Sequence, residues 1–452
     1  MEMERETGAG GDRGASSGYF PIVSSPPATR APTPASSAVL TPAASAAVPS
    51  LNPFQTLQRH RNFRIFWAGQ TTSLIGTWMQ TMAQGWLALE LSNSPFIVGL
   101  VASAGSFPVL LFSLHAGVVA DRTEKLRLVK LGQIAFGIQA TLLWWFTWSK
   151  HITIGWLLAL ATANGVINAF EIPARQSFVV ELVGRDDLPG AIALNSSGFN
   201  IARVVGPSIG GAIIAGLGLA WCFGINALSY IAVIGGLMMI KLPAWTPPEH
   251  LASPFEGIRE GIRFMRDTPA IAALMRYVAV YSILGVPYLT LMPVVARDQL
   301  GLQAGGYGAL LACVGVGGVS GALWLAAVGD RYDRMRLLAT TSYAYGILLV
   351  LFSLVRHAAF AYPLLFGIGF TMIVTNALAN STLQHIVPNE LRGRLMAAYS
   401  FIVVGLSSVL GSLLAGSVAH AIGVAWAIGG GAAIMLAYGF FVFERRPDLR
   451  SR

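Results

Sequence analysis

The segment 121–128, with the sequence DRTEKLRL, recurs 209 residues later as 330–337, with the sequence DRYDRMRL. Each copy follows one long apolar run and precedes another. The matching order of the Asp-Arg pair, the later basic residues and the final Leu predicts a duplicated unit. Chance similarity between two basic loops is the alternative, and the matching places of the two copies in the series of apolar runs argue against it.

Outward from these copies, the chain is a succession of apolar runs. Of its 452 residues, 54% are hydrophobic and 11% are charged, whereas an average soluble protein has about 25% charged residues. Each run is long enough to cross about 30 Å of hydrocarbon. We therefore expect an all-α membrane protein with twelve transmembrane helices in two pseudo-symmetric six-helix bundles. A soluble multidomain enzyme, a disulfide scaffold and a nucleic-acid binder all fit this composition poorly. The expected helices are 64–89, 95–119, 127–148, 153–177, 190–215, 219–241, 268–293, 305–328, 336–356, 361–385, 394–418 and 423–443.

Composition shifts divide the chain. Residues 1–53 are rich in Ala, Ser, Pro and Thr and are expected to form a disordered cytoplasmic tail. The capping-box spacing that begins at Ser253 predicts an amphipathic helix on the bilayer surface; a helical linker that packs on the bundle is the alternative. The expected parts after the tail are an N-terminal bundle at 54–241, a linker at 242–267, a C-terminal bundle at 268–445 and a second cytoplasmic tail at 446–452.

The distribution of Lys and Arg predicts the topology. When twelve helices are threaded through a bilayer, nearly all basic residues at helix ends fall on one side, and only Lys150, Arg297 and Arg356 fall on the other. Positively charged loops stay in the cytoplasm, so both termini are expected on the cytoplasmic side. The protein itself is expected in the cell (inner) membrane. This bias accounts for most of the net charge of +9 without nucleic acid as a partner.

Two charged residues lie inside apolar runs. Glu171 is in the fourth expected helix and Arg203 in the fifth. An ionisable group inside a membrane is costly unless it is paired or protonated, and it is a functional candidate by default. We expect Glu171 and Arg203 to face each other, so that protonation of Glu171 releases the pair and favours a second state. A permanent pair of Glu171 with Arg175 or Arg203 that only fixes helix packing is the alternative.

Polar residues recur at spacings of three and four along the first expected helix and would be unsatisfied against lipid. A similar pattern marks the fourth and tenth helices, where two Asn pairs match at an offset close to that of the repeat. We expect these residues to line a central cavity, with one Tyr near the midplane; hydrogen bonds that merely hold the helices together are the alternative. The candidates are Gln70, Thr77, Gln80, Gln84, Asn164, Asn168, Asn376, Asn380 and Tyr281.

The motifs resemble a known family. The sequence GVVADR at 117–122, followed by Lys125, resembles the loop signature GxxxDRxx[KR] of the major facilitator superfamily. FEIPARQS at 170–177, together with Asn195, Arg203 and GPSIGG at 206–211, is similar to the bacterial twelve-helix drug:proton antiporter branch, which includes enterobactin exporters and macrolide efflux pumps. The resemblance covers about residues 54–445. The departures are Glu124, Ala326 and Ala202, where the family pattern or the first copy of the repeat has Gly.

The resemblance implies that the repeated loops form a latch on the cytoplasmic side. A glycine allows two helices to approach closely, and the Asp at the end of a helix needs a partner such as an Arg or a helix N-terminus. Such a contact would hold one conformation and break in the other. A plain topology signal made of basic loop residues is the alternative. The expected latch residues are Gly117, Asp121, Arg122, Lys125, Asp330, Arg331 and Arg334.

The fifth helix carries a bend motif made of Gly206, Pro207, Gly210 and Gly211, which combines a proline bend with close packing. The resemblance connects this motif with proton antiport and implies that the first, fourth, seventh and tenth helices line the cavity. The candidates for proton coupling are Glu171, Arg203 and Asp121.

No metal-ligand cluster and no Walker phosphate loop appears in the sequence, so no metal, cofactor or use of ATP is expected, and the chain is not expected to be an enzyme. The resemblance implies a monomeric, proton-coupled exporter of a small amphiphilic molecule, drug-like or siderophore-like, that works by alternating access. A facilitator or importer of a small nutrient is one alternative. A transporter-like sensor that does not transport and signals through residues 1–50 is the other.

Overall fold

A computed structural model describes residues 53–242, 268–387 and 398–444, together with Arg263, Arg266, Leu395 and Met396. Within these ranges, the side chains at positions 53, 114, 330 and 404 are not described. Both expected tails and the expected amphipathic helix of the linker lie outside the described residues.

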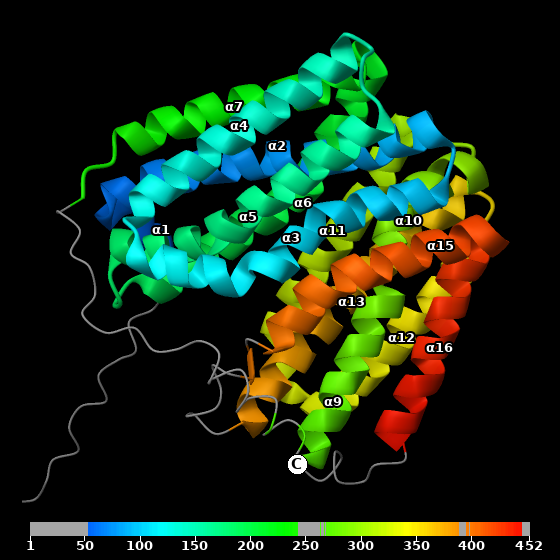
Figure 1. Cartoon of the computed structure of the whole chain (residues 1–452). Helices are drawn as coiled ribbons and strands as arrows, with labels where there is room; N and C mark the ends of the chain where they lie inside the picture. The colour runs from blue at the N-terminus through cyan, green and yellow to red at the C-terminus, as the bar shows by residue number, and fades with distance from the viewer. Residues whose placement is uncertain are drawn as a thin grey trace, which may run out of the picture. The chain divides into compact units, whose positions relative to one another are not determined.

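The first group of helices runs from residue 53 to residue 238 and is drawn from blue to green in Figure 1. Glycines with positive φ end two of these helices: Gly184 (+72°) follows α5 and Gly218 (+93°) follows α6. Only glycine adopts this backbone conformation without a steric cost. The helices are α1 (Pro53–Arg59), α2 (Arg61–Ser92), α3 (Pro95–Arg122), α4 (Lys125–Trp148), α5 (Ile154–Val183), α6 (Leu188–Leu217) and α7 (Ala220–Met238).

The second group runs from residue 269 to residue 444. Its first span continues from Pro269 to Gln299, beyond the expected end at 293, and contains two π-helical turns. The elements are α9 (Pro269–Val280), η1 (Tyr281–Gly285), α10 (Tyr288–Val294), η2 (Val295–Gln299), α11 (Ala304–Val328), η3 (Gly329–Arg331), α12 (Arg334–Leu354), α13 (Ala358–Ile386), η4 (Phe401–Gly411), α15 (Ser412–Ile422) and α16 (Val424–Glu444).

Among the described residues, 11 helical segments are long and apolar enough to cross a membrane. The expected first span lies within α2, a 32-residue helix that is not among those 11. Polar side chains such as Gln70, Gln80 and Gln84 lower the hydropathy of α2. The expectation of an all-helical membrane protein is thus confirmed, whereas twelve spans remain a prediction.

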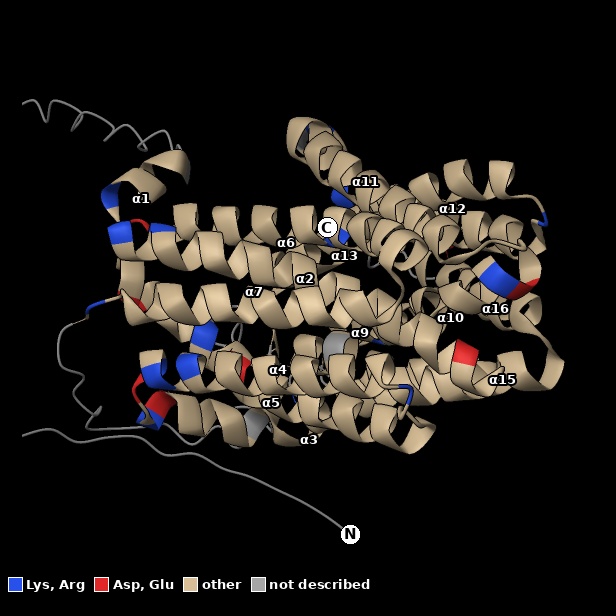
Figure 2. Ribbon diagram, turned by 90° about the horizontal axis from the view of Figure 1, so that it is seen from above, with Lys and Arg blue, Asp and Glu red and all other residues tan. Residues whose placement is uncertain are grey.

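The helices pack as two groups, which we call the N-group (α2–α7) and the C-group (α9–α16). Most buried apolar side chains of each group contact others of the same group. The two groups meet chiefly where α6 packs on α11 and where α3 packs on α15 (Figure 1). Lys, Arg, Asp and Glu lie mainly near helix ends, and many of them gather at one end of the N-group (Figure 2).

Candidate functional site

A cavity of about 400 Å³ lies between the N-group and the C-group. Small-molecule sites in proteins are commonly clefts of about 300–1,000 Å³, so the space suits a small ligand. We call it the upper cavity; its walls include Trp78, Met82, Gln84, Asn164, Arg203, Tyr307, Met372 and Ser412. A second cavity of about 580 Å³, the lower cavity, shares Arg203, Leu289 and Met372 with the upper cavity and is lined mainly by α13.

Four of the expected cavity residues line these spaces. Gln84 of α2 and Asn164 of α5 contribute to the upper cavity. Asn376 and Asn380 of α13 contribute to the lower cavity. The first, fourth and tenth expected helices therefore all contribute polar groups to the space between the helix groups.

Two other candidates on α2 bind neighbouring helices instead. Gln80 is 2% exposed; its Nε2 donates to Gln139 of α4 at 3.0 Å, and its Oε1 accepts from Asn226 of α7 at 2.8 Å. Thr77 lies 3.2 Å from the hydroxyl of Tyr230. Neither residue is among those that line the upper or the lower cavity, and both form the interhelical hydrogen bonds that were the alternative.

The last three candidates line neither cavity among the described residues. Gln70 is buried on α2. The amide of Asn168 donates to Asn164 within α5. Tyr281 is buried at the start of η1, where its hydroxyl donates to the carbonyl of Met372 and accepts from Asn376, both at 3.4 Å. These residues therefore stand behind the cavity walls.

Glu171 of α5 is 4% exposed and is the only charged side chain among the buried residues that the structure describes. The Nε of Arg175, one helical turn later, donates to its carboxylate at 3.1 Å. The Nε2 of Gln133 on α4 donates to Oε1 at 3.2 Å. Gly132 leaves room for the acid, because a Cβ there would come within 2.9 Å of Glu171 Cγ.

Arg203 of α6 does not face Glu171, so the expected pair is not formed in this structure. Its Nε and Nη2 are buried and have no hydrogen-bond partner among the described residues. The guanidinium reaches toward α11, where a Cβ on Gly318 would come within 2.3 Å of Nη2. The pair with Arg175, which was the alternative, is the one that Glu171 forms.

The bend motif of α6 provides close helix contacts. Pro207 lies inside the helix. A Cβ on Gly206 would come within 2.7 Å of the backbone oxygen of Ile75 on α2, and one on Gly210 within 3.0 Å of Met79 Cγ. A Cβ on Gly211 would come within 3.2 Å of Ala304 O on α11.

Two further glycines complete the contacts between the helix groups. A Cβ on Gly308 of α11 would come within 2.6 Å of the carbonyl oxygen of Pro207. At the crossing of α3 and α15, a Cβ on Gly99 would come within 2.4 Å of Ser412 O and 3.1 Å of the Cα of Gly416. Backbone thus packs directly on backbone. We call the end of the helix groups marked by Gly99, Gly211 and Gly308 the closed end.

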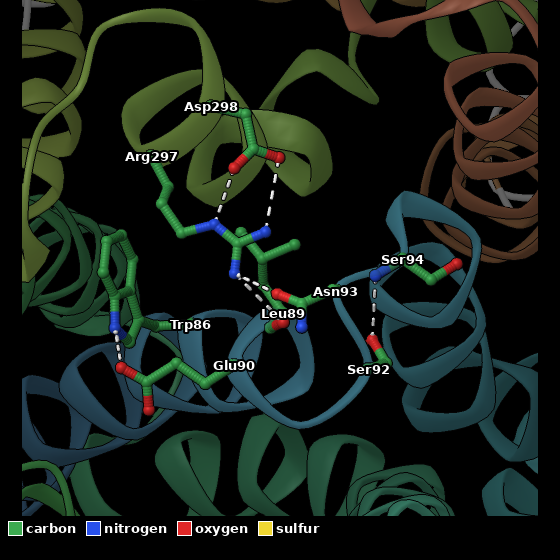
Figure 3. Close-up of polar contacts among 8 residues, drawn as sticks. All are labelled: Trp86, Leu89, Glu90, Ser92, Asn93, Ser94, Arg297 and Asp298. Atoms are coloured by element: carbon green, nitrogen blue, oxygen red, sulfur yellow. Dashed lines mark hydrogen bonds and ion pairs between the residues drawn. The ribbon is translucent and has the colours of Figure 1, made fainter.

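A polar contact also joins the groups at the closed end (Figure 3). The Nη1 of Arg297 on η2 donates to Asn93 Oδ1 at 2.9 Å and to the carbonyl of Leu89 at 3.3 Å, while its Nε donates to Asp298 at 2.6 Å. The sequence interpretation did not single out Arg297 as a site residue. One signal was available, since it is one of the few basic residues expected on the less basic side of the membrane.

The latch residues of the first copy, Gly117, Asp121, Arg122 and Lys125, lie at the end of the N-group away from the closed end. A Cβ on Gly117 would meet nothing within 4 Å. The side chains of Asp121 and Arg122 are exposed and have no hydrogen bond or ion pair with any described residue. Lys125 Nζ lies 3.7 Å from Glu181 of α5.

The second copy of the repeat shows a local helix cap. Asp333, three residues after Asp330, accepts from the backbone N–H of Arg336 at 2.7 Å and begins α12. The side chain of Asp330 is not described, Arg331 is exposed, and Arg334 is the first residue of α12. The acidic residue before the helix thus has a capping role of the usual kind.

Another cluster that the sequence interpretation missed joins α1 to α6. His60 Nε2 lies 2.7 Å from Asp187 Oδ2, and Arg59 Nη1 donates to Asp187 Oδ1 at 3.4 Å. The hydrogen bond from His60, assisted by the charge of Arg59, lowers the pKa of the Asp187 carboxyl below its usual value despite a partial opposing effect of desolvation. The cluster ties the segment before the first long helix to the N-group.

Comparisons with known proteins agree with this architecture. The family model described as transmembrane secretion effector matches residues 50–450. The multidrug efflux pump Tap of Mycolicibacterium fortuitum is 25% identical over 362 residues, which cover 78% of this chain and 88% of Tap. The enterobactin exporter EntS of Shigella flexneri is 23% identical over 361 residues, 80% of this chain and 86% of EntS. The staphyloferrin A transporter of Staphylococcus aureus is 24% identical over 292 residues, 64% of this chain and 72% of that protein.

Solved structures share the fold. A bacterial homologue of the human lysosomal transporter Spinster, in an inward-facing and unoccupied conformation, gives a TM-score of 0.67 at 14% identity and covers 86% of this chain and 98% of its own. A peptide transporter, POT, solved in complex with sulfate, gives 0.70 at 12% identity and covers 86% and 95%. The chain is a multi-pass, non-enzymatic membrane transporter, and it belongs to the transmembrane secretion effector family of the major facilitator superfamily.

Proposed function

We propose that this chain exports a small amphiphilic molecule from the cytoplasm by alternating access, driven by inward proton flow. In this proposal it is a monomer in the inner membrane. α2 serves as the first span and, with the 11 candidate spans, brings their number to twelve. Six of these helices form each bundle, over 54–241 and 268–445. Both termini are cytoplasmic because the basic loops gather on one side of the membrane.

One observation carries the proposal: a cavity lies between two helix groups whose helices make close backbone contacts at one end. These contacts lie at Gly99, Gly211 and Gly308. A Cβ on Gly117, at the opposite end of the N-group, would meet nothing within 4 Å. Transporters of this kind rock two halves about a central site, so we assign the present state to the one that is open to the cytoplasm, with the latch at Gly117 and Asp121 forming in the other state.

The class of cargo is inferred from the relatives, whose names give a multidrug efflux pump, an enterobactin exporter and a staphyloferrin A transporter. The cavity supports a molecule of that kind, because Trp78, Met82 and Tyr307 supply apolar wall. An amphiphile places its apolar part on such a surface.

Glu171 is proposed as the site of proton coupling. Its carboxylate is buried and held by Arg175 and Gln133 within the N-group. Protonation would remove the charge that Arg175 pairs with and would free the guanidinium, so the packing of α5 on α4 would depend on the protonation state. Asp121 is exposed and is assigned to the latch.

The test uses the purified full chain in proteoliposomes with an imposed pH gradient and a panel of siderophores, macrolides and cationic dyes. We expect uptake into vesicles against the direction of proton flow for at least one compound. Transport that follows the compound's own gradient and ignores the pH gradient would instead establish a facilitator. No transport of any panel member in either direction would contradict the proposal.

Two variants locate the coupling. Glu171→Gln is expected to abolish proton-driven transport while exchange of labelled for unlabelled compound, with no pH gradient, continues. Asp186→Asn, at an exposed acid in the loop between α5 and α6, is the matched control and is expected to behave as the wild type. Full proton-driven transport by the Glu171→Gln variant would show that the Glu171–Arg175 pair is only structural.

A further inference from the structure

We infer that the upper cavity binds the anionic oxygen group of the cargo, which Arg203 and Gln84 hold as hydrogen-bond donors. This inference rests on the proposed function, in which the cavity is the binding site of the cargo. It narrows the cargo to amphiphiles with a carboxylate or similar oxyanion.

Arg203 is the first half of the argument. Its Nε and Nη2 are shielded from solvent and have no acceptor among the described residues. A buried cation without a partner is costly and is normally paired or bound to a ligand. Gly318 allows the Arg203 side chain to reach the surface of α11, because the Cβ of any other residue at position 318 would come within 2.3 Å of Nη2.

The surroundings do not neutralise this charge. Neither the upper nor the lower cavity has an Asp or Glu among the described residues that line it. Glu171, the one buried acid in the described part of the chain, is engaged by Arg175 and Gln133. The guanidinium therefore faces both cavities without a carboxylate among the described residues that line them.

Gln84 supplies the second half. Its Nε2 is also buried without an acceptor among the described residues, and Gln84 lines the upper cavity from α2. The two groups lie on different helices of the N-group and contribute donors that no protein oxygen satisfies. Because buried donors are nearly always paired, each of them requires an acceptor that arrives from outside. An oxyanion is the acceptor that a guanidinium recognises best, since it can take two N–H bonds at once.

The other residues of the cavity wall indicate the chemistry of the rest of the ligand. Trp78, Met82, Tyr307, Leu311, Val314 and Met372 provide aromatic and aliphatic surface around the two donors. The complementary ligand has an apolar or aromatic body and one oxyanion head. A cationic amphiphile would bring a like charge beside Arg203, which costs binding energy.

The inference is tested by equilibrium binding of three dansyl probes to the purified full chain in nanodiscs, without any ion gradient. Dansylglycine carries a carboxylate, dansylglycinamide carries a neutral amide, and dansylcadaverine carries an ammonium group. Energy transfer from tryptophan, including Trp78 in the cavity wall, reports binding. We expect dansylglycine to bind at least about tenfold more tightly than dansylglycinamide and dansylcadaverine to bind most weakly, because a hydrogen bond to a charged group contributes roughly that factor or more.

Variants identify the donors. Arg203→Gln is expected to remove the preference for dansylglycine over the amide, Arg203→Lys to keep part of it, and Gln84→Leu to weaken dansylglycine binding with a smaller loss. Arg276→Gln changes an exposed Arg on α9 whose Nε donates within its own helix; as the matched control it keeps the preference. Equal binding of the three probes, a preference for dansylcadaverine, or no saturable binding of dansylglycine would overturn the inference.

A second measurement does not depend on the choice of probe. Without ligand, Arg203→Gln is expected to raise the Tm of the purified chain, because the variant removes a charged group whose Nε and Nη2 are buried without a partner among the described residues; a lower Tm would show that Arg203 has a structural partner and would contradict the inference. Failure of the proposed function is separate. Loss of proton-driven transport would leave the binding preference for dansylglycine intact, and loss of that preference would leave transport of the cationic dyes intact.

Discussion

Replacement of Gly99 by Ala is expected to open the closed end. The added Cβ would lie 2.4 Å from the backbone oxygen of Ser412 and 3.1 Å from the Cα of Gly416. Ordinary contacts of this kind begin near 3.4 Å, so α3 and α15 would have to separate by about 1 Å. The obstacle is helix backbone, which cannot rotate away as a side chain can.

The magnitude follows from this displacement. Overpacking of a close contact costs about 1–3 kcal/mol, and the cost falls only on the state in which the two helices touch. A bias of that size shifts a two-state equilibrium by roughly 5- to 150-fold. The Gly99→Ala variant should therefore populate the opposite, latched state and transport more slowly.

The assay is a cross-link across the same crossing. Ser94 Oγ and His420 Nδ1 lie 3.4 Å apart, so Ser94→Cys and His420→Cys together, in a chain with Cys222→Ala and Cys313→Ala, report closure with a short thiol reagent. Gly99→Ala should lower the cross-linking yield several-fold. Gly430→Ala, on α16 with nothing within 4 Å of its Cβ, is the control and should leave the yield unchanged. An undiminished yield for Gly99→Ala would refute the reasoning.

Three other perturbations separate the roles of the remaining groups. Gly117→Leu should leave the Tm unchanged, because the space around Gly117 is open in this structure, yet it should slow transport, since the latch must close there; unchanged transport would make the loop a topology signal only. Gln80→Leu should lower stability by about 2–4 kcal/mol, because the amides of α4 and α7 lose their partner inside the N-group, without changing binding of dansylglycine; a Tm equal to that of the wild type would contradict this. Asp187 should hold α1 on α6 at neutral pH and release it as the pH falls through its lowered pKa, since the carboxylate contributes stability only while it is ionised. The protection factors for hydrogen exchange in α1, which correct for the intrinsic exchange rate at each pH, should fall in acid and, in the Asp187→Asn variant, at neutral pH as well; protection that does not change in either case would exclude the role.

Hydrophobic runs predicted the helices well because each run has to satisfy its own backbone in the membrane, and a helix does so locally. The repeated Asp-Arg segment likewise placed both loops at equivalent positions, after α3 and after α11. The continuation of α10 into η2 as far as Gln299 was not predicted. Nothing in the local pattern marks where an apolar run leaves the bilayer when the next residues can still be helical.

The partners of the polar residues were harder to predict. A stripe of amides on α2 must avoid lipid, and that requirement is met equally by a cavity, as at Gln84, or by a neighbouring helix, as at Gln80. Periodicity gives the direction of each side chain within its own helix and carries no information about which helix covers it. The choice of Arg175 over Arg203 as the partner of Glu171 has the same origin, because the i, i+4 pair needs only one helix and the other pair depends on how two helices are rotated.

Where Gly211 and Gly308 bring α6 against α11, the atoms nearest to the two glycines are backbone atoms. Closing these two contacts therefore orders no side chain at either glycine, and the glycines carry no group that acid or salt can change. Such a contact can separate and form again in a way that depends little on the pH or salt concentration on either side of the membrane. Under the proposed function, directionality must then come from groups deeper in the protein, at Glu171 and in the upper cavity.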